Sequence, residues 1–267
     1  MTVFARSVLL LGLCIALTAP VHAGLLGHWA FDNNYTQSGD SLSGEVGLAP
    51  DAAAGAGGQA PTFSSDAKFG GQSMYLDGQS FQYASVADDG WDDNMTNMTI
   101  AVWIKRTYES GTGVSYPYCK NRYFHSLKAD ESADVLSTEQ DWDYTTSTSL
   151  DAALPLNQWA HVATVIDTTQ HLAMLYIDGD LVDSVPTTRD YVRGSSDPLL
   201  FGTYDTSLTN GRWYFDGLFD ECWIYDAALS EGEIENLMAY NNIVPEPALL
   251  TMLLIGAVGV VARRRRG

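Results

Sequence analysis

Residues 211–238 read GRWYFDGLFDECWIYDAALSEGEIENLM, and this stretch predicts how the domain ends. In its first half, apolar residues such as Phe215 and Ile224 stand among acidic ones, with a period near two that is typical of a strand with one buried face. In its second half, Ser230 and Glu233 have the spacing of a capping box, in which each side chain binds a free backbone N–H at a helix start. The stretch therefore predicts a strand, a tight turn and a short capped helix.

Upstream of this stretch, the apolar residues favour strands over helices. Residues 99–106, 159–166 and 171–178 are rich in β-branched and aromatic residues, which suit a half-buried pleated surface. The dipeptide Asp178-Gly179 is a hairpin turn signal. No helical period outside the capped helix is convincing, so the sequence predicts an all-β domain over residues 24–240.

Four segments, in order, resemble the laminin-G-like jelly rolls of the concanavalin A-like lectin/glucanase superfamily. They are GLLGHWAFDNN (24–34), TIAVWIKRT (99–107), LPLNQWAHVATVIDTTQHLAMLYIDGDLV (154–182) and FDGLFDECWIYDAALSEGEIENL (215–237). The resemblance implies a two-sheet antiparallel jelly-roll sandwich that ends in one short helix. Two features depart from it: Cys222 stands where these domains usually have an aliphatic residue, and residues 111–144 match no pattern of the family.

The composition limits the classes of partner. The 267 residues are 46% hydrophobic, which is enough for one substantial core. With 14 basic and 33 acidic residues the formal net charge is −19, and such a surface repels a phosphate backbone, so we expect no nucleic-acid partner. Calcium and other hard cations fit this charge, although acidity also keeps a secreted protein soluble.

The N-terminus has the three parts of a secretory signal peptide. Arg6 supplies the positive region, residues 8–17 the apolar core, and Val21-His22-Ala23 a small-residue cleavage site. The apolar run is too short for a membrane span. We therefore expect residues 1–23 to be removed on export and the mature chain to begin at Gly24.

Export also decides how the cysteines are interpreted. Cys14 leaves with the signal peptide, and Cys119 and Cys222 remain as a pair in an oxidising compartment. A disulfide between them needs the right Cα separation. The sequence leaves two alternatives open, which are that disulfide and two buried free thiols.

The C-terminal residues 241–267 have a different composition. They contain, in order, Pro245, Glu246, Pro247, the apolar residues 248–262, Arg263, Arg264, Arg265 and Arg266. This order resembles the PEP-CTERM sorting signal of Gram-negative bacteria. The resemblance implies an exosortase-type partner, a transmembrane helix that anchors the protein transiently in the inner membrane, and later transfer to the cell surface or the extracellular space. The alternative is an ordinary tail anchor, held by the arginine cluster on the cytoplasmic side.

Catalytic motifs are weak in this sequence. Retaining glycosidases of the superfamily carry Glu-x-Asp-x-Glu on one strand, and the nearest match here is Glu139-Gln140-Asp141-Trp142-Asp143. It ends in Asp, whose shorter side chain draws back one carboxyl group in a site where the two lie only ~5–5.5 Å apart. We therefore predict no catalytic residue and no enzyme activity. A divergent glycoside hydrolase is the alternative.

Three aspartates are candidate calcium ligands. Asp32 follows the first predicted strand, and Asp216 and Asp220 flank the Phe-Asp-Gly turn. If the first and last strands are neighbours, these carboxylates come together, and calcium takes several carboxylate and carbonyl oxygens from loops. The structural alternative is that Asp220 and Glu221 accept hydrogen bonds that fix the turn. A second acidic loop, residues 88–94, lacks the downstream Glu and the helices of an EF-hand and is interpreted as a solvated turn.

Aromatic side chains give the candidate ligand surface, because an aromatic face suits the apolar face of a sugar ring. The candidates are Trp91, Trp142 and Trp213, together with Tyr116 and Tyr118. Since large aromatic residues mostly fill interiors, each is also a candidate for the core. The predicted function is a secreted, non-catalytic protein that binds an extracellular polysaccharide or surface glycan. A purely structural matrix protein is the remaining alternative.

Overall fold

The computed structural model describes most of the predicted domain. The described residues are 24–33, 52–54, 60–88, 90–93, 95–108, 113–121, 125–140, 144–207 and 213–241. All described residues belong to one compact unit, Ala23–Val244. The predicted signal peptide and sorting signal therefore lie outside the described residues.

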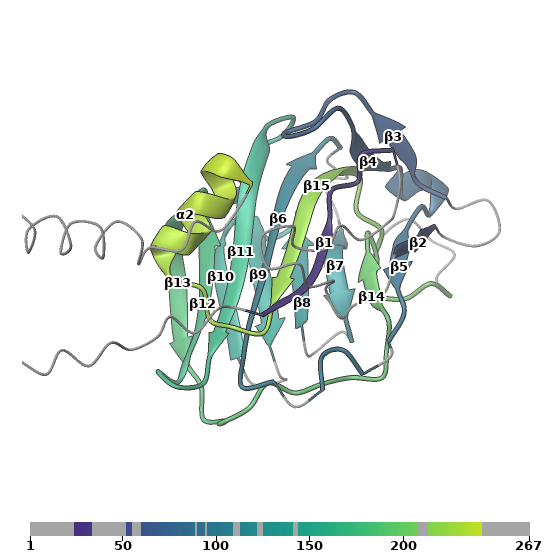
Figure 1. Cartoon of the computed structure of the whole chain (residues 1–267). Helices are drawn as coiled ribbons and strands as arrows, with labels where there is room; N and C mark the ends of the chain where they lie inside the picture. Colours follow the sequence, from purple (N-terminus) through teal and green to yellow (C-terminus); the bar gives the residue numbers. More distant parts are fainter. Residues whose placement is uncertain are drawn as a thin grey trace, which may run out of the picture. The chain divides into compact units, whose positions relative to one another are not determined.

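Two antiparallel sheets form the domain (Figure 1). The eight-stranded sheet consists, in spatial order, of β13 (Asp180–Pro186), β12 (Leu172–Ile177), β11 (Trp159–Asp167), β6 (Asn97–Arg106), β15 (Gly217–Tyr225), β4 (Ser73–Leu76) and β3 (Thr62–Ser64), with β1 (Leu25–Trp29) also paired to β15. The seven-stranded sheet consists of β10 (Tyr144–Ser149), β9 (Val135–Gln140), β8 (His125–Asp130), β7 (Val114–Lys120), β14 (Leu199–Phe201), β5 (Ala84–Val86) and β2 (Ala52–Ala54). The predicted all-β, two-sheet antiparallel sandwich is confirmed.

One hydrophobic core lies between the two sheets. Alternate residues of β6, such as Val102 and Ile104, belong to the same buried cluster as Leu127 of β8, Phe201 of β14 and Phe219 of β15. Full burial of such a side chain stabilises a fold by about 1.5–3 kcal/mol. The alternation of apolar residues along the strands is therefore what holds the sheets face to face.

A bulge in β15 explains the pattern of its sequence. Phe219 and Ile224 are an odd number of residues apart, which in a regular strand would put them on opposite faces. Both belong to the core cluster, because the pairing of β15 with β6 shifts register between Asp220 and Trp223. Glu221 lies in this shift with a φ of +50°, the left-handed conformation that such irregularities use.

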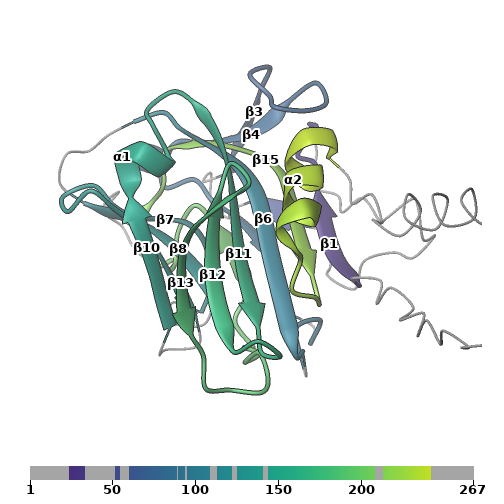
Figure 2. The same ribbon diagram turned by 90° about the vertical axis from the view of Figure 1, so that its left-hand side faces the viewer.

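The helix α2 (Glu231–Tyr240) closes the domain as predicted. The Ser230 hydroxyl accepts a hydrogen bond from the backbone N–H of Glu233 at 3.4 Å, and the Glu233 carboxylate accepts one from the Ser230 N–H at 2.7 Å. Ile234 of the helix packs with Trp223 in a second hydrophobic cluster, separate from the core between the sheets. Figure 2 shows α2 against the eight-stranded sheet, beside β6 and β15. The helix therefore covers part of the outer face of that sheet.

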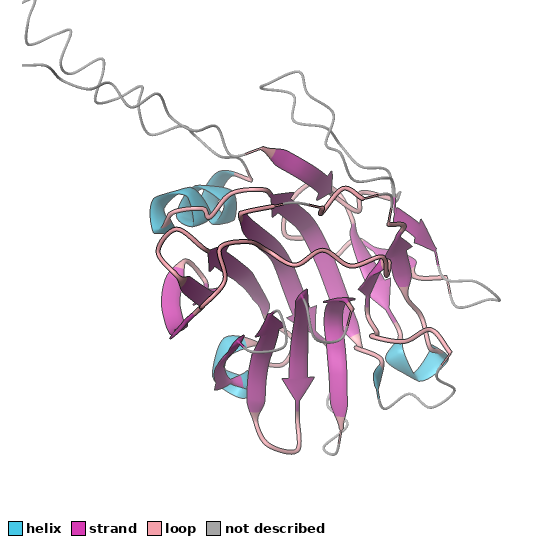
Figure 3. Ribbon diagram, turned by 90° about the horizontal axis from the view of Figure 1, so that it is seen from below, coloured by secondary structure: helices cyan, strands magenta, loops and turns pink. Residues whose placement is uncertain are grey.

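Strands make up most of the described chain (Figure 3). Two single turns, α1 (Leu150–Ala153) and the 3-10 turn η1 (Gly78–Ser80), were not predicted, because they are too short to show a helical period. No helix within the described ranges is long and apolar enough to cross a membrane. The anchor helix predicted in residues 241–267 lies outside those ranges.

The two cysteines of the domain belong to different sheets. Cys119 lies on β7 and Cys222 on β15, and both are buried thiols that no disulfide joins. Burial raises the pKa of the Cys222 thiol far above its ordinary value. Of the two alternatives, the structure therefore has two buried thiols without a disulfide, and Cys222 acts as a small apolar core residue.

The chain segment before β1 is fixed to the turn after β15. The backbone N–H of Gly24 donates to the carboxylate of Asp226 at 2.7 Å, and the Asp226 N–H donates to the Gly24 carbonyl oxygen at 2.9 Å. A Cβ at residue 24 would lie 2.5 Å from the Asp226 carboxylate, so glycine allows this close approach.

Candidate functional site

Three aromatic rings form a cluster at the N-terminal end of β7. The ring centroids are 4.9 Å apart for Tyr116 and Tyr204, 5.4 Å for Tyr204 and Trp213, and 6.4 Å for Tyr116 and Trp213. Tyr116 is buried, with 1% of its surface exposed, whereas Tyr204 and Trp213 are half-buried. The cluster therefore has a buried base and two rings that reach the surface.

Backbone contacts bring these rings together from distant parts of the sequence. Tyr116 forms an isolated parallel bridge with Tyr214. The Gly202 N–H donates to the Pro117 carbonyl oxygen at 2.8 Å, and the Phe215 N–H donates to the Gly202 carbonyl oxygen at 2.8 Å. Gly202 has a φ of +94°, which few other residues adopt without strain. The segment around Gly202 is therefore fixed between the other two.

The other predicted ligand-binding aromatics lie elsewhere. Tyr118 is buried in the core, where its hydroxyl shares a hydrogen bond with the Thr164 hydroxyl of β11 at 2.9 Å. Trp91 is also buried, with 6% of its surface exposed, and Trp142 lies outside the described residues. The structure thus groups Trp213 with Tyr116 and adds Tyr204, which the sequence does not single out. The turn around Tyr204 has no local feature that would identify it.

Two of the predicted calcium ligands hold the same loop. One carboxylate oxygen of Asp32 accepts hydrogen bonds from the backbone N–H groups of residues 71 and 72, both at 2.8 Å. One carboxylate oxygen of Asp220 accepts from the N–H groups of residues 68 and 69, at 2.6 and 2.9 Å. These contacts match the structural alternative for Asp220, in which its carboxylate fixes a turn.

Asp216 lies apart from that loop. Its carboxylate accepts a hydrogen bond from the Thr107 hydroxyl at 2.7 Å, and burial raises its pKa, partly offset by that bond. Across the described ranges, no group of three or more His, Cys, Asp or Glu side chains is placed to hold a metal ion. The structure therefore does not bring Asp32, Asp216 and Asp220 together as one ligand set, because each carboxylate binds amides or hydroxyls near it.

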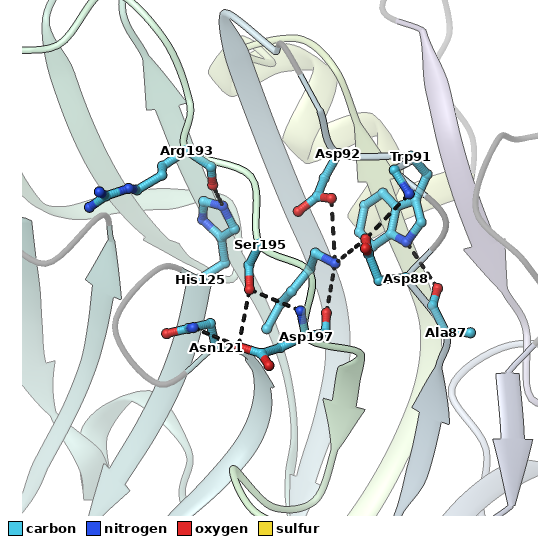
Figure 4. Close-up of polar contacts among 11 residues, drawn as sticks. Ala87, Asp88, Trp91, Asp92, Asn121, His125, Arg193, Ser195 and Asp197 are labelled. Atoms are coloured by element: carbon cyan, nitrogen blue, oxygen red, sulfur yellow. Dashed lines mark hydrogen bonds and ion pairs between the residues drawn. The ribbon is translucent and has the colours of Figure 1, made fainter.

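A buried charged cluster lies at the C-terminal end of β7 (Figure 4). The Lys120 ammonium lies 2.9 Å from the Asp197 carbonyl oxygen, 3.0 Å from the Asp88 carboxylate and 3.4 Å from the Asp92 carboxylate. The face of the Trp91 ring is 4.7 Å away, measured to its centroid. Lys120 is 1% exposed and Asp92 is 0% exposed. The interpretation of this loop as a solvated turn is therefore wrong at Trp91 and Asp92, which are buried beside the Lys120 ammonium, whereas Asp93 is exposed.

Burial shifts the pKa values of two groups around this ammonium. It raises the pKa of Asp92 to about 6, an effect that the nearby Lys120 opposes. It lowers the pKa of His125 to about 4, so that the imidazole is neutral at pH 7. One ring nitrogen of His125 lies 2.9 Å from the Arg193 carbonyl oxygen. The cluster is closed in by protein on all these sides, unlike the aromatic cluster at the other end of β7.

The candidate catalytic carboxylates can be placed only in part. Glu139 lies on β9 in the seven-stranded sheet, and it is half-buried. Asp141 and Asp143, with which it would form the degraded glycosidase motif, lie outside the described residues.

Comparison with known proteins gives a family and a set of similar folds. Residues 62–235 match a family model described as the concanavalin A-like lectin/glucanases superfamily. No curated protein sequence matches the chain.

Among solved structures, domain 4 of AbnA, a GH43 extracellular arabinanase from Geobacillus stearothermophilus, is similar with a TM-score of 0.58 and 21% identity over 81% of this chain and 98% of that domain. The binding domain of botulinum neurotoxin DC is similar with a TM-score of 0.57 and 15% identity over 83% of this chain and 53% of that one. The binding domain of Paraclostridial Mosquitocidal Protein 1 has a TM-score of 0.58, 16% identity and coverages of 80% and 52%. The chain thus spans about half of each toxin binding domain, and at these identities the similarity concerns the fold.

Proposed function

Because the chain belongs to the concanavalin A-like lectin/glucanase superfamily, we propose that it is a non-catalytic carbohydrate-binding protein that acts outside the cell. The binding surface is the cluster of Tyr116, Tyr204 and Trp213. The observation that carries the proposal is that the buried Tyr116 supports two partly exposed rings. Rings that are already held in place lose little conformational entropy when a sugar packs on them.

Two of the similar structures support a saccharide as the ligand. The arabinanase domain is described in complex with arabinotriose, and the neurotoxin binding domain in complex with SialylT. These ligands are bound by those proteins. We propose a saccharide ligand for this chain because it has a similar fold and, in addition, the aromatic cluster described above.

The charge of the chain narrows the kind of saccharide. The formal net charge is −19, and like charges across an interface disfavour binding and slow association. The proposed ligand is therefore a neutral polysaccharide or surface glycan rather than an acidic one.

The predicted tail gives the proposal a location. Pro245, Glu246, Pro247 and the arginine cluster motivate export, transient anchoring in the inner membrane and transfer by an exosortase-type enzyme to the cell surface or extracellular matrix. In this location the domain would attach the protein to a neutral polymer outside a Gram-negative cell.

Binding to a panel of neutral and acidic glycans by the mature domain tests the proposal. We expect Trp213→Ala and Tyr204→Ala each to weaken binding of the neutral hit roughly tenfold, since an aromatic contact contributes ~0.5–1.5 kcal/mol beyond its buried area. Tyr191→Ala is the matched control, because Tyr191 is 48% exposed and lies outside the cluster. Unchanged affinity in both cluster variants would refute the proposed surface. Hydrolysis of the bound glycan that Glu139→Gln abolishes would instead support the glycoside hydrolase alternative.

A further inference from the structure

The strand register brings a lysine and several oxygens together at one end of the seven-stranded sheet. Lys120 of β7 pairs with Leu199 of β14, which pairs with Val86 of β5, so these residues form one row. Asp88 and Asp197 each lie two residues beyond that row, at the same end of the sheet. The long Lys120 side chain reaches past the end of its own strand and places its ammonium between them.

The contacts of this ammonium are those of a cation in a binding site. Two carboxylates and one backbone carbonyl surround it, and the indole face of Trp91 closes a further side (Figure 4). Three of these groups belong to Asp88, Trp91 and Asp92, which are close in sequence, and Trp91 and Asp92 are both buried.

Among these groups, the Asp92 carboxylate depends most on the positive charge of the Lys120 ammonium. Asp92 is fully buried, and neither of its carboxylate oxygens forms a hydrogen bond of ordinary geometry with the described residues. Besides the Lys120 ammonium, the groups that act on it are the backbone N–H of Ser195 and the like-charged carboxylate of Asp88. A buried carboxylate in that position depends on a nearby cation, because removing an ion from water is costly when hydrogen bonds do not replace the water. One of its oxygens lies 3.4 Å from the Lys120 nitrogen, so the ammonium is that cation.

The donor atoms around the ammonium have the chemistry of a calcium site. Calcium prefers carboxylate and carbonyl oxygens from loops, at ~2.3–2.6 Å. The three oxygens here lie 2.9–3.4 Å from the Lys120 nitrogen. They would close in by ~0.3–1.1 Å around a metal ion, the Asp92 oxygen by the most, and water would complete the coordination.

We propose that the Lys120 ammonium occupies a cation-binding site. When the ammonium is removed by substitution of Lys120, this site binds a divalent cation of the calcium type in its place. The ligands are Asp88, Asp92 and the carbonyl oxygen of Asp197. In the natural chain the Lys120 ammonium therefore balances the charge of Asp88 and Asp92 at this end of the sandwich, and no metal ion is needed there.

Two substitutions of the same residue separate the charge of Lys120 from its volume. Lys120→Ala removes the ammonium and opens space, whereas Lys120→Met removes the ammonium and keeps an apolar chain in its place. Both leave buried carboxylates without a counter-charge, which should lower the melting temperature by roughly 5–10 °C. Millimolar calcium should restore most of this loss in Lys120→Ala and none of it in Lys120→Met, because only the alanine variant has room for the ion.

Differential scanning fluorimetry in calcium and in EGTA, with calorimetric titration of calcium into each protein, tests this. We expect one calcium ion to bind per Lys120→Ala chain. In Lys105→Ala, calcium should change the melting temperature no more than it does in the wild type. Lys105 is the matched control, since it pairs with the half-exposed Asp66 carboxylate at 2.6 Å. The proposal is overturned if calcium leaves the melting temperature of Lys120→Ala unchanged, or if it shifts the wild type and Lys120→Ala equally.

A folding failure would also decide the question. If Lys120→Ala is unfolded without metal, its refolding from urea is compared in calcium and in EGTA. Recovery that requires calcium supports the proposal. Failure in both solutions, while Lys120→Met folds, overturns it.

Discussion

Asp220 of β15 is a carboxyl group that the fold keeps partly neutral. One of its oxygens accepts two backbone hydrogen bonds from residues 68 and 69, and the other has no partner among the described residues. Burial raises its pKa to about 7; the two backbone hydrogen bonds oppose this effect, and the negative charges of Glu221 and Asp32 add to it. Near neutral pH the group is therefore present in both charge states.

We predict that Asp220 makes the domain less stable as the pH rises. Its folded pKa of about 7 exceeds the ordinary value of ~3.9 expected for the unfolded chain. The bound proton therefore stabilises the fold fully below pH ~4, and this contribution is lost as the pH rises through 7. Thermal unfolding between pH 4 and pH 8 should show a smaller fall in stability with pH for Asp220→Asn than for the wild type.

Asp66 provides a control with the opposite sign. A hydrogen bond from Lys105 is the main cause that lowers its pKa, so its contribution is present at neutral pH and lost on acidification. Asp66→Asn should therefore lose stability at pH 7 and little at low pH. If Asp220→Asn follows the same pH slope as the wild type, the buried carboxyl group is not the cause of that slope.

The same Asp220 variant tests the calcium prediction. Because Asp220 binds backbone amides, we expect the difference in melting temperature between wild type and Asp220→Asn to be equal in calcium and in chelator. A difference that grows in calcium would support a metal site at this residue instead.

At single positions, the sequence predicts the chemical role of a side chain better than it predicts the burial and the neighbours of that side chain. The sequence predicts stacking roles for Trp213 and Tyr116, which lie together. It does not indicate Tyr204, because only tertiary contacts connect that residue to them. The acidic and polar neighbours of Asp92 predict a solvated turn. Its burial depends on Lys120, which is far away in the sequence and arrives through the register of three strands.

At the scale of elements, the C-terminal strand and helix could be predicted because their determinants are local. The capping box needs only Ser230 and Glu233, and the structure forms both of its hydrogen bonds. The strands of the seven-stranded sheet in residues 114–149 were harder, because several of their buried side chains are polar. An example is the hydrogen bond of 2.8 Å between the hydroxyls of Thr138 and Thr146, which alternation of apolar residues cannot reveal.

We predict that the cap of α2 stabilises the domain measurably. Ser230→Ala removes the hydroxyl that accepts from the Glu233 N–H, and loss of an N-cap costs about 0.5–2 kcal/mol. Urea unfolding followed by circular dichroism should show that loss. Ser230→Thr keeps a hydroxyl, so its free energy of unfolding should stay close to that of the wild type. Equal losses of stability in both variants would show that a change in packing, and not the lost hydrogen bond, destabilises the domain.

At the scale of the whole molecule, the tail should be removed in the native host. The order of Pro245, Glu246, Pro247, an apolar run and four arginines motivates this prediction. Mass spectrometry of protein from the cell surface or medium should find a C-terminus before the arginine cluster. Surface material that retains residues 258–267 would contradict exosortase-type processing and favour an ordinary tail anchor.

The contact between Gly24 and Asp226 has a consequence for maturation. If the leader is cut after Ala23, the amide nitrogen that now donates to Asp226 at 2.7 Å becomes an α-ammonium group, with an ordinary pKa near 7.7–8.0. Proteolysis would then convert a hydrogen bond from a neutral amide into an ion pair with the Asp226 carboxylate, and the mature protein would be more stable than its precursor. A chain that starts at Gly24 should melt above one that carries extra N-terminal residues, and Asp226→Asn should abolish most of that difference.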